Sequence, residues 1–281
     1  MKLGFMVYSL GRTISEGRLS LAEAFELMRE CGAEGVDVSD WNVQGQSIAD
    51  VARMVAEAGL AVSSYISGAN LCIGPGQERQ AAIDKLKMRL DDAAELGAKT
   101  VLFTTGAAAP GQDRKEARRN VAEGLAELLP LARERGIVLT IEDFGSTLSP
   151  HQTSGECLEV CELAGPELRL TYDTGNMIMG EEDPVDFLRK TAHLIVHAHA
   201  KDWELLPADH EGPAVVSRSG KKYRGTVVGQ GVLDYPAIIA ALKAIGYEGY
   251  ISFEYEGPGD QVEAARQGCA YLLKLMGSAL E

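Results

Sequence analysis

Four residues that can bind a metal ion or carry a proton follow successive apolar runs in the second half of the sequence. They are Glu142, Asp173, His199 and Glu254. Acidic residues after strands commonly cap the next helix, but four successive runs with such an ending favour a shared site. Three carboxylates around one point repel one another, and a divalent cation among them removes that cost. Three carboxylates and one imidazole suit a hard to borderline ion, so we expect Mn²⁺, with Mg²⁺ or Co²⁺ as alternatives.

The elements that must position these residues alternate as strand and helix along the whole chain. Apolar runs predict strands at residues 3–8, 35–39, 60–66, 100–104, 137–142, 168–173, 194–199 and 250–254. Helical spacing and capping residues predict helices at about 20–32, 47–58, 78–96, 115–135, 154–163, 234–245 and 260–276, and one more after Asp183. Pro130 is expected to kink or split the segment 115–135.

Eight strands that alternate with eight helices predict an α/β fold of the (β/α)8 TIM-barrel class, in which the carboxyl ends of the strands converge on one mouth. That convergence brings the four residues together. The rival doubly wound fold needs a glycine-rich phosphate turn after an early strand, and residues 8–12 contain a single glycine, Gly11. Because no linker divides the chain, we expect one domain over residues 1–281. A long irregular loop at about 203–231 is typical of a functional lid or of a disordered segment.

The composition excludes several classes of protein. The sequence has 27 Lys and Arg against 41 Asp and Glu, a formal net charge of −14, which argues against nucleic acid as a partner. No apolar run approaches the roughly 20 residues of a membrane helix, and the first residues read as a strand rather than a signal peptide. We therefore expect a cytoplasmic protein. The five cysteines are an odd number and suit reduced thiols. Homo-oligomerisation remains open.

The motifs around the four residues resemble those of the xylose isomerase-like TIM barrels, in particular the sugar phosphate isomerase/epimerase family. The resemblance lies in residues 141–142, 172–176, 197–202, 229–234 and 246–256. It implies that Glu142, Asp173, His199 and Glu254 bind one divalent metal ion. It also implies that Glu142 and Glu254 act as an acid/base pair on a small-molecule sugar or keto-sugar.

The chemistry implied by this resemblance has three outcomes. A metal ion that binds a carbonyl and its neighbouring hydroxyl stabilises an enediolate after a carboxylate removes the adjacent proton. Return of the proton gives an epimer or an isomer, and loss of a β-hydroxyl gives a dehydrated product. We expect a sugar or keto-sugar epimerase or isomerase, with a dehydratase or lyase on an inosose or 3-keto-glycoside as the alternative. Asn176 stands where many relatives have His, which weakens the case for a free-ketose 3-epimerase.

Two other classes of function fit the sequence less well. Abasic-site endonucleases share this barrel, but they hold three Zn²⁺ ions with a larger set of histidines and a basic groove. Five histidines and a charge of −14 argue against them. A non-catalytic sugar-binding module would not need all four metal ligands.

Further residues near the strand ends are candidates for substrate binding. Asn176 is expected to hydrogen-bond a substrate hydroxyl. Lys201 is expected either to bind a substrate oxygen or to form an ion pair with Asp202. Three aromatic residues follow strand ends and are expected to stack on a sugar ring or to pack within loops, namely Tyr8, Trp41 and Trp203.

The remaining histidines and a basic cluster have simpler interpretations. His197 lies two residues before His199 and points to the same side of the strand, where a buried hydrogen-bonding role is expected. His151 and His210 lie in predicted loops and are expected to be solvent-exposed. A basic cluster in the stretch 203–231 is expected to be solvated or paired with acidic residues, with an anion or a neighbouring subunit as alternatives; it comprises Arg218, Lys221, Lys222 and Arg224.

Overall fold

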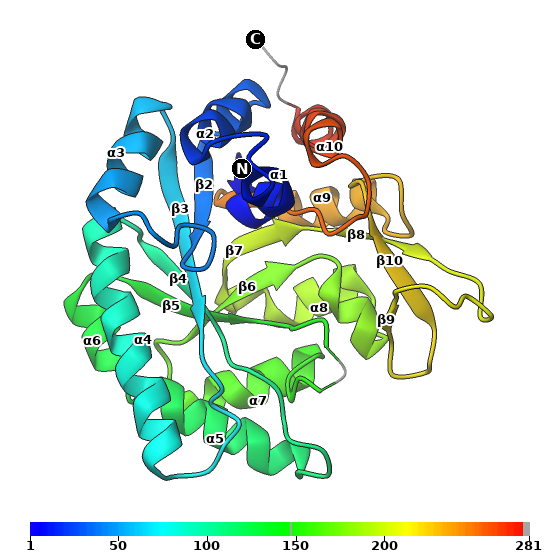
Figure 1. The fold of residues 1–281 in the computed structure, drawn as a ribbon. Coiled ribbons are helices and arrows are strands. Elements are labelled where there is room, and N and C mark those ends of the chain that lie inside the picture. Colours follow the sequence, from blue (N-terminus) through cyan, green and yellow to red (C-terminus); the bar gives the residue numbers. More distant parts are fainter. Residues whose placement is uncertain (147, 278–281) are drawn as a thin grey trace.

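In the computed structural model, which describes residues 1–146 and 148–277, eight parallel strands form a closed barrel (Figure 1). Their order around the barrel is β1-β11-β7-β6-β5-β4-β3-β2, so each strand pairs with its neighbours along the chain. This arrangement confirms the predicted (β/α)8 barrel. The strands are β1 (Lys2–Met6), β2 (Gly35–Ser39), β3 (Ala61–Gly68), β4 (Thr100–Thr104), β5 (Val138–Glu142), β6 (Arg169–Asp173), β7 (Ile195–Ala200) and β11 (Tyr250–Phe253).

Helices surround the barrel, and their first turns are capped as the sequence suggests. The side chains of Ser20, Asp183 and Asp234 each accept a backbone N–H from the first turn of the helix that follows. The principal helices are α2 (Leu21–Glu30), α3 (Ile48–Glu57), α4 (Gln77–Leu96), α5 (Arg114–Ala126), α6 (Leu129–Glu134), α7 (Ser154–Ala164), α8 (Pro184–Thr191), α9 (Tyr235–Ala244) and α10 (Gln261–Met276). Among the described residues, no helix is both long and apolar enough to cross a membrane.

Two predicted segments have different boundaries in the structure. The predicted helix 115–135 is divided into α5 and α6 around Leu128, and Pro130 lies in the first turn of α6. Proline is tolerated there because its missing N–H would have no helical partner. The predicted strand 3–8 ends earlier, at Met6, because the chain turns into a 3-10 helix, η1 (Val7–Leu10), and then α1 (Gly11–Ser15).

The stretch 203–231 was expected to be irregular, and that expectation is wrong. It contains most of a three-stranded antiparallel sheet in the order β8 (Asp202–Leu205), β10 (Lys222–Thr226), β9 (Val215–Val216). This sheet projects from one side of the barrel mouth (Figure 1). Its inner side is held by a small apolar cluster in which Trp203 and Tyr223 pack with Met179.

The apolar core lies mainly between the barrel and its helices, whereas the barrel interior is largely polar. Val36 and Val38 of β2 belong to the same apolar cluster as Phe25 and Met28 of α2. Asp37 lies between those two valines in the strand, and its side chain points to the opposite face, into the barrel. Fully or almost fully buried polar residues on other strands include Thr140, Thr171, His197 and Ser252. All five cysteines are buried free thiols.

Candidate metal centre and active site

The four predicted metal ligands converge at the carboxyl ends of four adjacent strands. His199 Nδ1 lies 3.4 Å from Glu142 Oε2, 3.6 Å from Glu254 Oε2 and 3.9 Å from Asp173 Oδ2. All four side chains are buried, and the most exposed of them, Glu142, has 7% of its surface accessible. The structure thus brings together residues that lie up to 112 positions apart in the chain (254 − 142).

Strand register explains why these side chains meet at one level. Glu142 and Asp173 are the last residues of β5 and β6, and Asp173 pairs with His199 of β7. Glu254 follows β11, and its backbone N–H donates to the carbonyl of Ala200, 2.9 Å away. Glu142 pairs with Thr171 and His199 pairs with Ser252, so Asp173 and Glu254 each lie two residues beyond those partners. Strands of a closed barrel tilt against its axis, and these offsets bring the four ligands to one end of the barrel.

The donor atoms fit a divalent cation. Asp173 Oδ1 accepts backbone N–H groups from Gly175 and Asn176, at 2.8 and 2.9 Å, which fixes the carboxylate. Its Oδ2, together with His199 Nδ1 and Glu254 Oε2, is buried without a hydrogen-bond partner. A buried polar atom without a partner costs about 1–3 kcal/mol. Carboxylate oxygens and an imidazole nitrogen that face one another in this way are ligands suited to Mg²⁺, Mn²⁺ or Zn²⁺.

Lys201 supplies a buried positive charge beside these ligands. Its Nζ lies 2.9 Å from Glu254 Oε1, 3.2 Å from Glu256 Oε1 and 3.4 Å from Asp173 Oδ2. The expected ion pair between Lys201 and Asp202 is wrong. Asp202 instead accepts backbone N–H groups from its own sheet and the following turn, because its side chain points away from the barrel mouth.

The electrostatics of the site follow from burial and from these contacts. Burial raises the pKa of Glu254 well above its ordinary value, and the nearby Lys201 only partly offsets that rise. Burial alone would lower the pKa of Lys201, but the carboxylates of Asp173, Glu254 and Glu256 outweigh it and raise the pKa. Burial likewise opposes charge on His199, yet Asp37, Glu142 and Glu254 raise its pKa well above the ordinary value.

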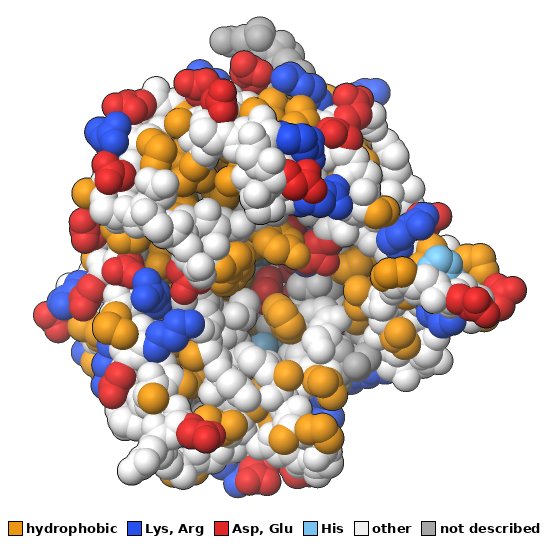
Figure 2. Space-filling view, viewed as in Figure 1, with side chains coloured by type: hydrophobic (Ala, Val, Ile, Leu, Met, Phe, Trp, Pro, Cys, Tyr) orange, Lys and Arg blue, Asp and Glu red, His pale blue; other side chains and the backbone are white. Residues whose placement is uncertain are grey.

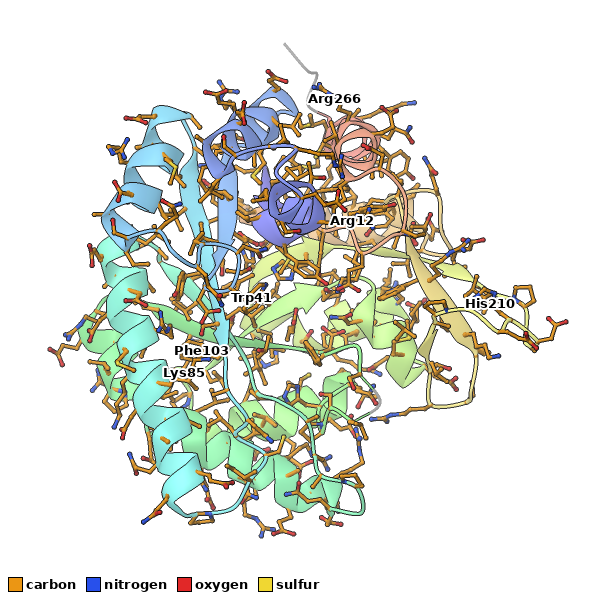
Figure 3. The ribbon with its side chains drawn as sticks, in the orientation of Figure 1. Arg12, Trp41, Lys85, Phe103, His210 and Arg266 are labelled. Atoms are coloured by element: carbon orange, nitrogen blue, oxygen red, sulfur yellow. The ribbon has the colours of Figure 1, made fainter. Side chains whose placement is uncertain are left out.

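The site opens into a cavity of about 250 Å³ at the mouth of the barrel. Glu142, Glu254 and Lys201 line it on one side, and Tyr8 and Trp41 line it with them. Figure 2 shows this face of the molecule hollowed at its centre, with acidic side chains at the bottom of the hollow. In Figure 3, Trp41 lies close to the mouth, after β2.

A second cavity of about 460 Å³ adjoins the first and shares Lys201 and Glu256 with it. Asn176 and Trp203 line this second cavity, and Lys201 Nζ lies 3.3 Å from Asn176 Oδ1. Trp203 is 2% exposed and lies with its ring centroid 5.8 Å from Lys201 Nζ. The predicted substrate-binding residues thus border two connected cavities rather than one.

The sequence did not indicate several residues that contact the site. Glu256 contacts Lys201, and Asp143 lies buried next to Glu142, where burial and the charges of Asp173 and Glu142 raise its pKa. Asp37, in the middle of β2, lies 3.2 Å from His199. Burial would raise the pKa of Asp37, but His197 and His199 outweigh burial and keep it well below its ordinary value. A polar residue between two valines was the available signal for Asp37.

Of the other three histidines with predicted surroundings, His197 is buried as expected, whereas His151 and His210 are less exposed than expected. His197 is buried and hydrogen-bonded, as expected, with its Nε2 2.8 Å from Asp37 Oδ2. His151 was expected to be exposed but is 2% accessible, because the loop after β5 folds back over the barrel. Its ring joins the hydroxyl of Thr105, 2.6 Å away, to the carbonyl of Glu142, 3.0 Å away. His210 is half-buried at the outer end of the β8–β10 sheet (Figure 3).

The basic cluster of the β8–β10 sheet is largely paired. Arg218 Nη2 lies 2.7 Å from Glu156 Oε2, and Arg224 Nη2 lies 2.6 Å from Glu204 Oε2. Lys222 donates to the carbonyl of His210, 2.6 Å away. These contacts agree with the expected pairing to acidic residues.

Known proteins with similar sequences include enzymes named inosose dehydratase. The chain is 28% identical over 255 residues to the inosose dehydratase of Geobacillus thermodenitrificans, a match that covers 85% of this chain and 83% of the relative. It is also 30% identical over 145 residues to inosose dehydratase 2 of Bacillus cereus, which covers 50% of this chain and 48% of that protein.

Solved structures show the same fold at lower sequence identity. The IOLI protein with a bound zinc atom superposes with a TM-score of 0.80 at 18% identity, covering 99% of this chain and 98% of that one. An L-ribulose 3-epimerase superposes with a TM-score of 0.77 at 18% identity, covering 98% and 94%. The family model of the xylose isomerase-like TIM barrel matches residues 25–275. With the closed barrel, this match shows that the chain belongs to the xylose isomerase-like TIM barrel family.

Proposed function

We propose that this chain is a divalent-metal-dependent enzyme that enolises a sugar or keto-sugar and returns it as an epimer or isomer. One observation carries the proposal: Glu142 and Glu254 converge with Asp173 and His199 at the bottom of a cavity that opens at the barrel mouth. Three ligand atoms there are buried without partners, which supports a cation among them.

The residues divide the chemistry between them. Glu142, Asp173, His199 and Glu254 would hold the ion, which supplies a positive charge that polarises a substrate carbonyl and acidifies the adjacent C–H. One of the two glutamates removes that proton, and the other returns a proton on the opposite face or at the neighbouring carbon. Lys201 holds Glu254 through a 2.9 Å ion pair and donates a hydrogen bond to a substrate oxygen.

Substrate contacts follow from the cavity walls. Tyr8 and Trp41 border the cavity above the two glutamates, so their rings are proposed to stack on the sugar. Asn176 and Trp203 border the adjoining cavity, where they are proposed to bind the outer hydroxyls. Mn²⁺ is the proposed ion, with Mg²⁺ or Co²⁺ as alternatives.

A second function, dehydration of an inosose or a 3-keto-glycoside, is favoured by one specific observation. The similarity to an inosose dehydratase extends over 85% of the chain. The same enolisation starts that reaction, and the ammonium of Lys201 beside Glu256 offers a proton to a departing hydroxyl.

An exchange experiment separates the two functions. The Mn²⁺-loaded protein is incubated in D₂O with a panel of ketoses, inososes and 3-keto-glycosides, and products are followed by NMR and mass spectrometry. Deuterium in an epimeric or isomeric product supports the first function, and a dehydrated product supports the second. Glu142→Gln and Glu254→Gln are expected to abolish turnover, and full turnover in either variant contradicts the acid/base assignment.

The proposal extends to the domain organisation of the protein, its cellular location and the class of its ligand. We propose that residues 1–281 form a single domain, that the protein acts in the cytoplasm, and that its ligand is a small sugar rather than nucleic acid. The net charge of −14 supports the last point.

A further inference from the structure

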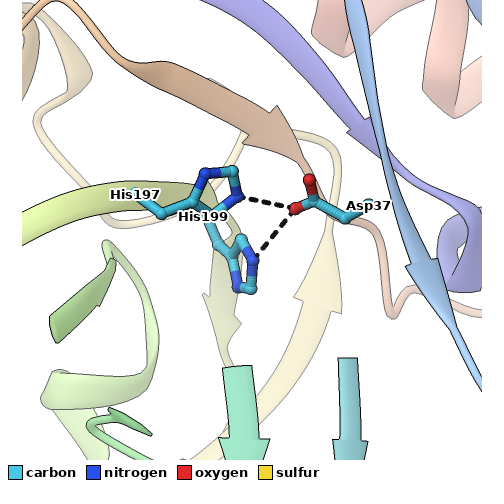
Figure 4. Close-up of side chains that lie close together, drawn as sticks. All are labelled: Asp37, His197 and His199. Carbon is cyan, nitrogen blue, oxygen red and sulfur yellow. Dashed lines mark hydrogen bonds and ion pairs between the residues drawn. The ribbon is translucent and has the colours of Figure 1, made fainter. Parts of the chain in front are cut away.

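A buried carboxylate lies inside the barrel, one layer below the proposed metal site. Asp37 of β2 has no exposed surface, and its Oδ2 faces two histidines of β7 from the opposite side of the barrel (Figure 4). That oxygen lies 2.8 Å from His197 Nε2 and 3.2 Å from His199 Nε2. The second is a charge contact without the alignment of a hydrogen bond, so His199 Nε2 has no hydrogen-bond partner among the described residues. Asp37 Oδ1 accepts a hydrogen bond from Ser63 Oγ at 2.5 Å.

This arrangement assigns the proton positions of His199. A carboxylate only accepts hydrogen bonds, so a nitrogen that faces Asp37 Oδ2 carries the hydrogen. A ring that binds a cation is neutral and has one N–H, and with that hydrogen on Nε2 the lone pair of His199 lies on Nδ1. Nδ1 is the atom that faces Glu142, Asp173 and Glu254. The ring is therefore in the tautomer that can bind a cation through Nδ1.

His197 and Ser63 hold the carboxylate in place. The N–H of His197 and the hydroxyl of Ser63 each donate to a different oxygen of Asp37, so the carboxylate cannot rotate without losing both contacts. The rings of His197 and His199 meet edge to face with their centroids 5.3 Å apart. The second contact partner of His197 Nε2 is Ser252 Oγ, 3.3 Å away.

The three residues Asp37, His197 and His199 also have donor atoms close enough to hold a metal ion themselves. Two observations favour hydrogen bonds instead. Both oxygens of Asp37 already have donors at 2.5 and 2.8 Å. Three carboxylates face His199 Nδ1, whereas a single carboxylate faces the two Nε2 atoms, so the greater negative charge lies on the other side of His199.

We propose that Asp37 is a positioning residue that fixes the tautomer and ring orientation of His199 so that Nδ1 binds the metal ion. This inference rests on the metal site of the proposed function. It adds a residue 162 positions before its target in the sequence (199 − 37), on a strand that carries none of the proposed ligands.

The test measures metal binding rather than turnover. Mn²⁺ is titrated calorimetrically into the chelator-treated wild-type protein, Asp37→Asn and Ser252→Ala. Asp37→Asn removes the charged acceptor, and we expect it to weaken binding by about 10- to 100-fold, the usual loss when a carboxylate partner of a ligand histidine is removed. Ser252→Ala is the matched control, because Ser252 is equally buried and its hydroxyl contacts the ring of His197. It should bind Mn²⁺ as the wild type does.

A second measurement needs no variant. In the Zn²⁺-loaded wild-type protein, long-range ¹H–¹⁵N spectra of the imidazole rings should show His199 protonated on Nε2 and coordinated through Nδ1. Unchanged Mn²⁺ affinity in Asp37→Asn, an equal loss in Ser252→Ala, or a proton on Nδ1 of His199 overturns the inference while leaving the metal site intact. Two ions per chain, one of them lost in Asp37→Asn, overturns it in favour of a second metal site. A wild-type protein that binds no ion overturns the metal site and this inference together.

Discussion

Lys201 is the residue on which the charge balance of the site depends. The residue is 5% exposed, and its ammonium lies within 3.4 Å of three carboxylates, those of Asp173, Glu254 and Glu256. Removal of one partner from a buried ion pair is strongly destabilising because it leaves charge buried and uncompensated. A bound cation would offset the negative charge of the same carboxylates. The stabilisation that it gives should therefore be larger when Lys201 is absent.

We predict that Lys201→Met lowers the free energy of unfolding of the metal-free protein by about 3 kcal/mol. Saturating Mn²⁺ should restore more stability to this variant than it adds to the wild type. Urea unfolding with EDTA and with Mn²⁺ measures both effects. Lys85→Met is the matched control, since Lys85 is exposed on α4 and donates to the backbone carbonyl of Gly68 rather than to a carboxylate. Equal stability of Lys201→Met and Lys85→Met would contradict the prediction.

His151 makes the stability of the protein depend on pH. Burial lowers the pKa of His151 to about 4, compared with about 6.5 in an unfolded chain. Between these two values the unfolded state binds more protons than the folded state. The stabilising contribution is therefore fully present above about pH 6.5 and is lost as the pH falls toward 4.

We expect this contribution to reach about 3 kcal/mol, and His151→Gln should have a correspondingly flatter profile between pH 6.5 and 4. Urea unfolding of the metal-free protein across this range measures the slope. His193→Gln is the control, because His193 is exposed, and it should retain the wild-type slope. A His151→Gln profile as steep as that of the wild type would rule out the buried neutral imidazole as the cause.

The sequence predicts the functional residues that stand at strand ends. It does not predict contacts that form only when the barrel closes. Glu142, Asp173, His199 and Glu254 end recognisable apolar runs, so their convergence follows from the barrel alone. Asp37 sits in the middle of its strand, and its partner His197 is 160 residues away. Nothing local indicates such a contact, because it exists only after β2 and β7 face each other across the barrel.

At the level of elements, the β8–β10 sheet forms one wall of the larger cavity. Val215 and Val216 of β9 line that cavity together with Trp203 of β8. Arg218, just beyond β9, connects the sheet to the start of α7 through Glu156 and through a 2.8 Å hydrogen bond to Gln152. Arg218 thus helps to hold this end of the wall, together with the hydrogen bonds that Ser217 and Ser219 donate to Glu181.

We predict that Arg218→Ala speeds hydrogen exchange of the amides in β9 and β10. The change in global stability should be at most about 1 kcal/mol, because the ion pair is partly exposed. Hydrogen-exchange mass spectrometry measures the local effect. Arg224→Ala is the control, since its partner Glu204 belongs to the same sheet. Unchanged exchange in Arg218→Ala would show that other contacts hold the wall.

Element boundaries were predictable where a residue type imposes them. Pro130 divides α5 from α6 because proline fits a first helical turn and not a helix interior. The β8–β10 sheet was not predicted, because β9 has only two residues and β10 alternates charged and polar residues around one aromatic, Tyr223. Such short strands gain their stability from pairing and from packing on Met179, neither of which the local sequence reveals.

For the whole molecule, the barrel interior is specialised for polar contacts while the helices provide the apolar core. Buried charge lines the axis from Asp37 up to Lys201, so part of the fold's stability depends on how that charge is compensated. A cation at the ligand layer would bind the folded chain and not the unfolded one, and it would therefore stabilise the whole barrel.

We predict that Mn²⁺ at 100 times its Kd raises the free energy of unfolding by about 2.7 kcal/mol, and that EDTA removes this increase. Asp173→Asn should abolish the effect of Mn²⁺, because Asp173 Oδ2 is one of the unpartnered ligand atoms. Asp183→Asn, a change at a helix cap outside the site, should retain it. Thermal unfolding with and without the ion measures the difference. A Tm that is independent of Mn²⁺ in the wild type would contradict the prediction.

The central claim is that Glu142, Asp173, His199 and Glu254 together hold one divalent ion, and anomalous diffraction from crystals soaked in Mn²⁺ tests it most directly. The account predicts a single strong peak within about 2.0–2.3 Å of His199 Nδ1 and of an oxygen from each of the three carboxylates. The absence of a peak there, or a peak between Asp37 and the Nε2 atoms of His197 and His199, would contradict it.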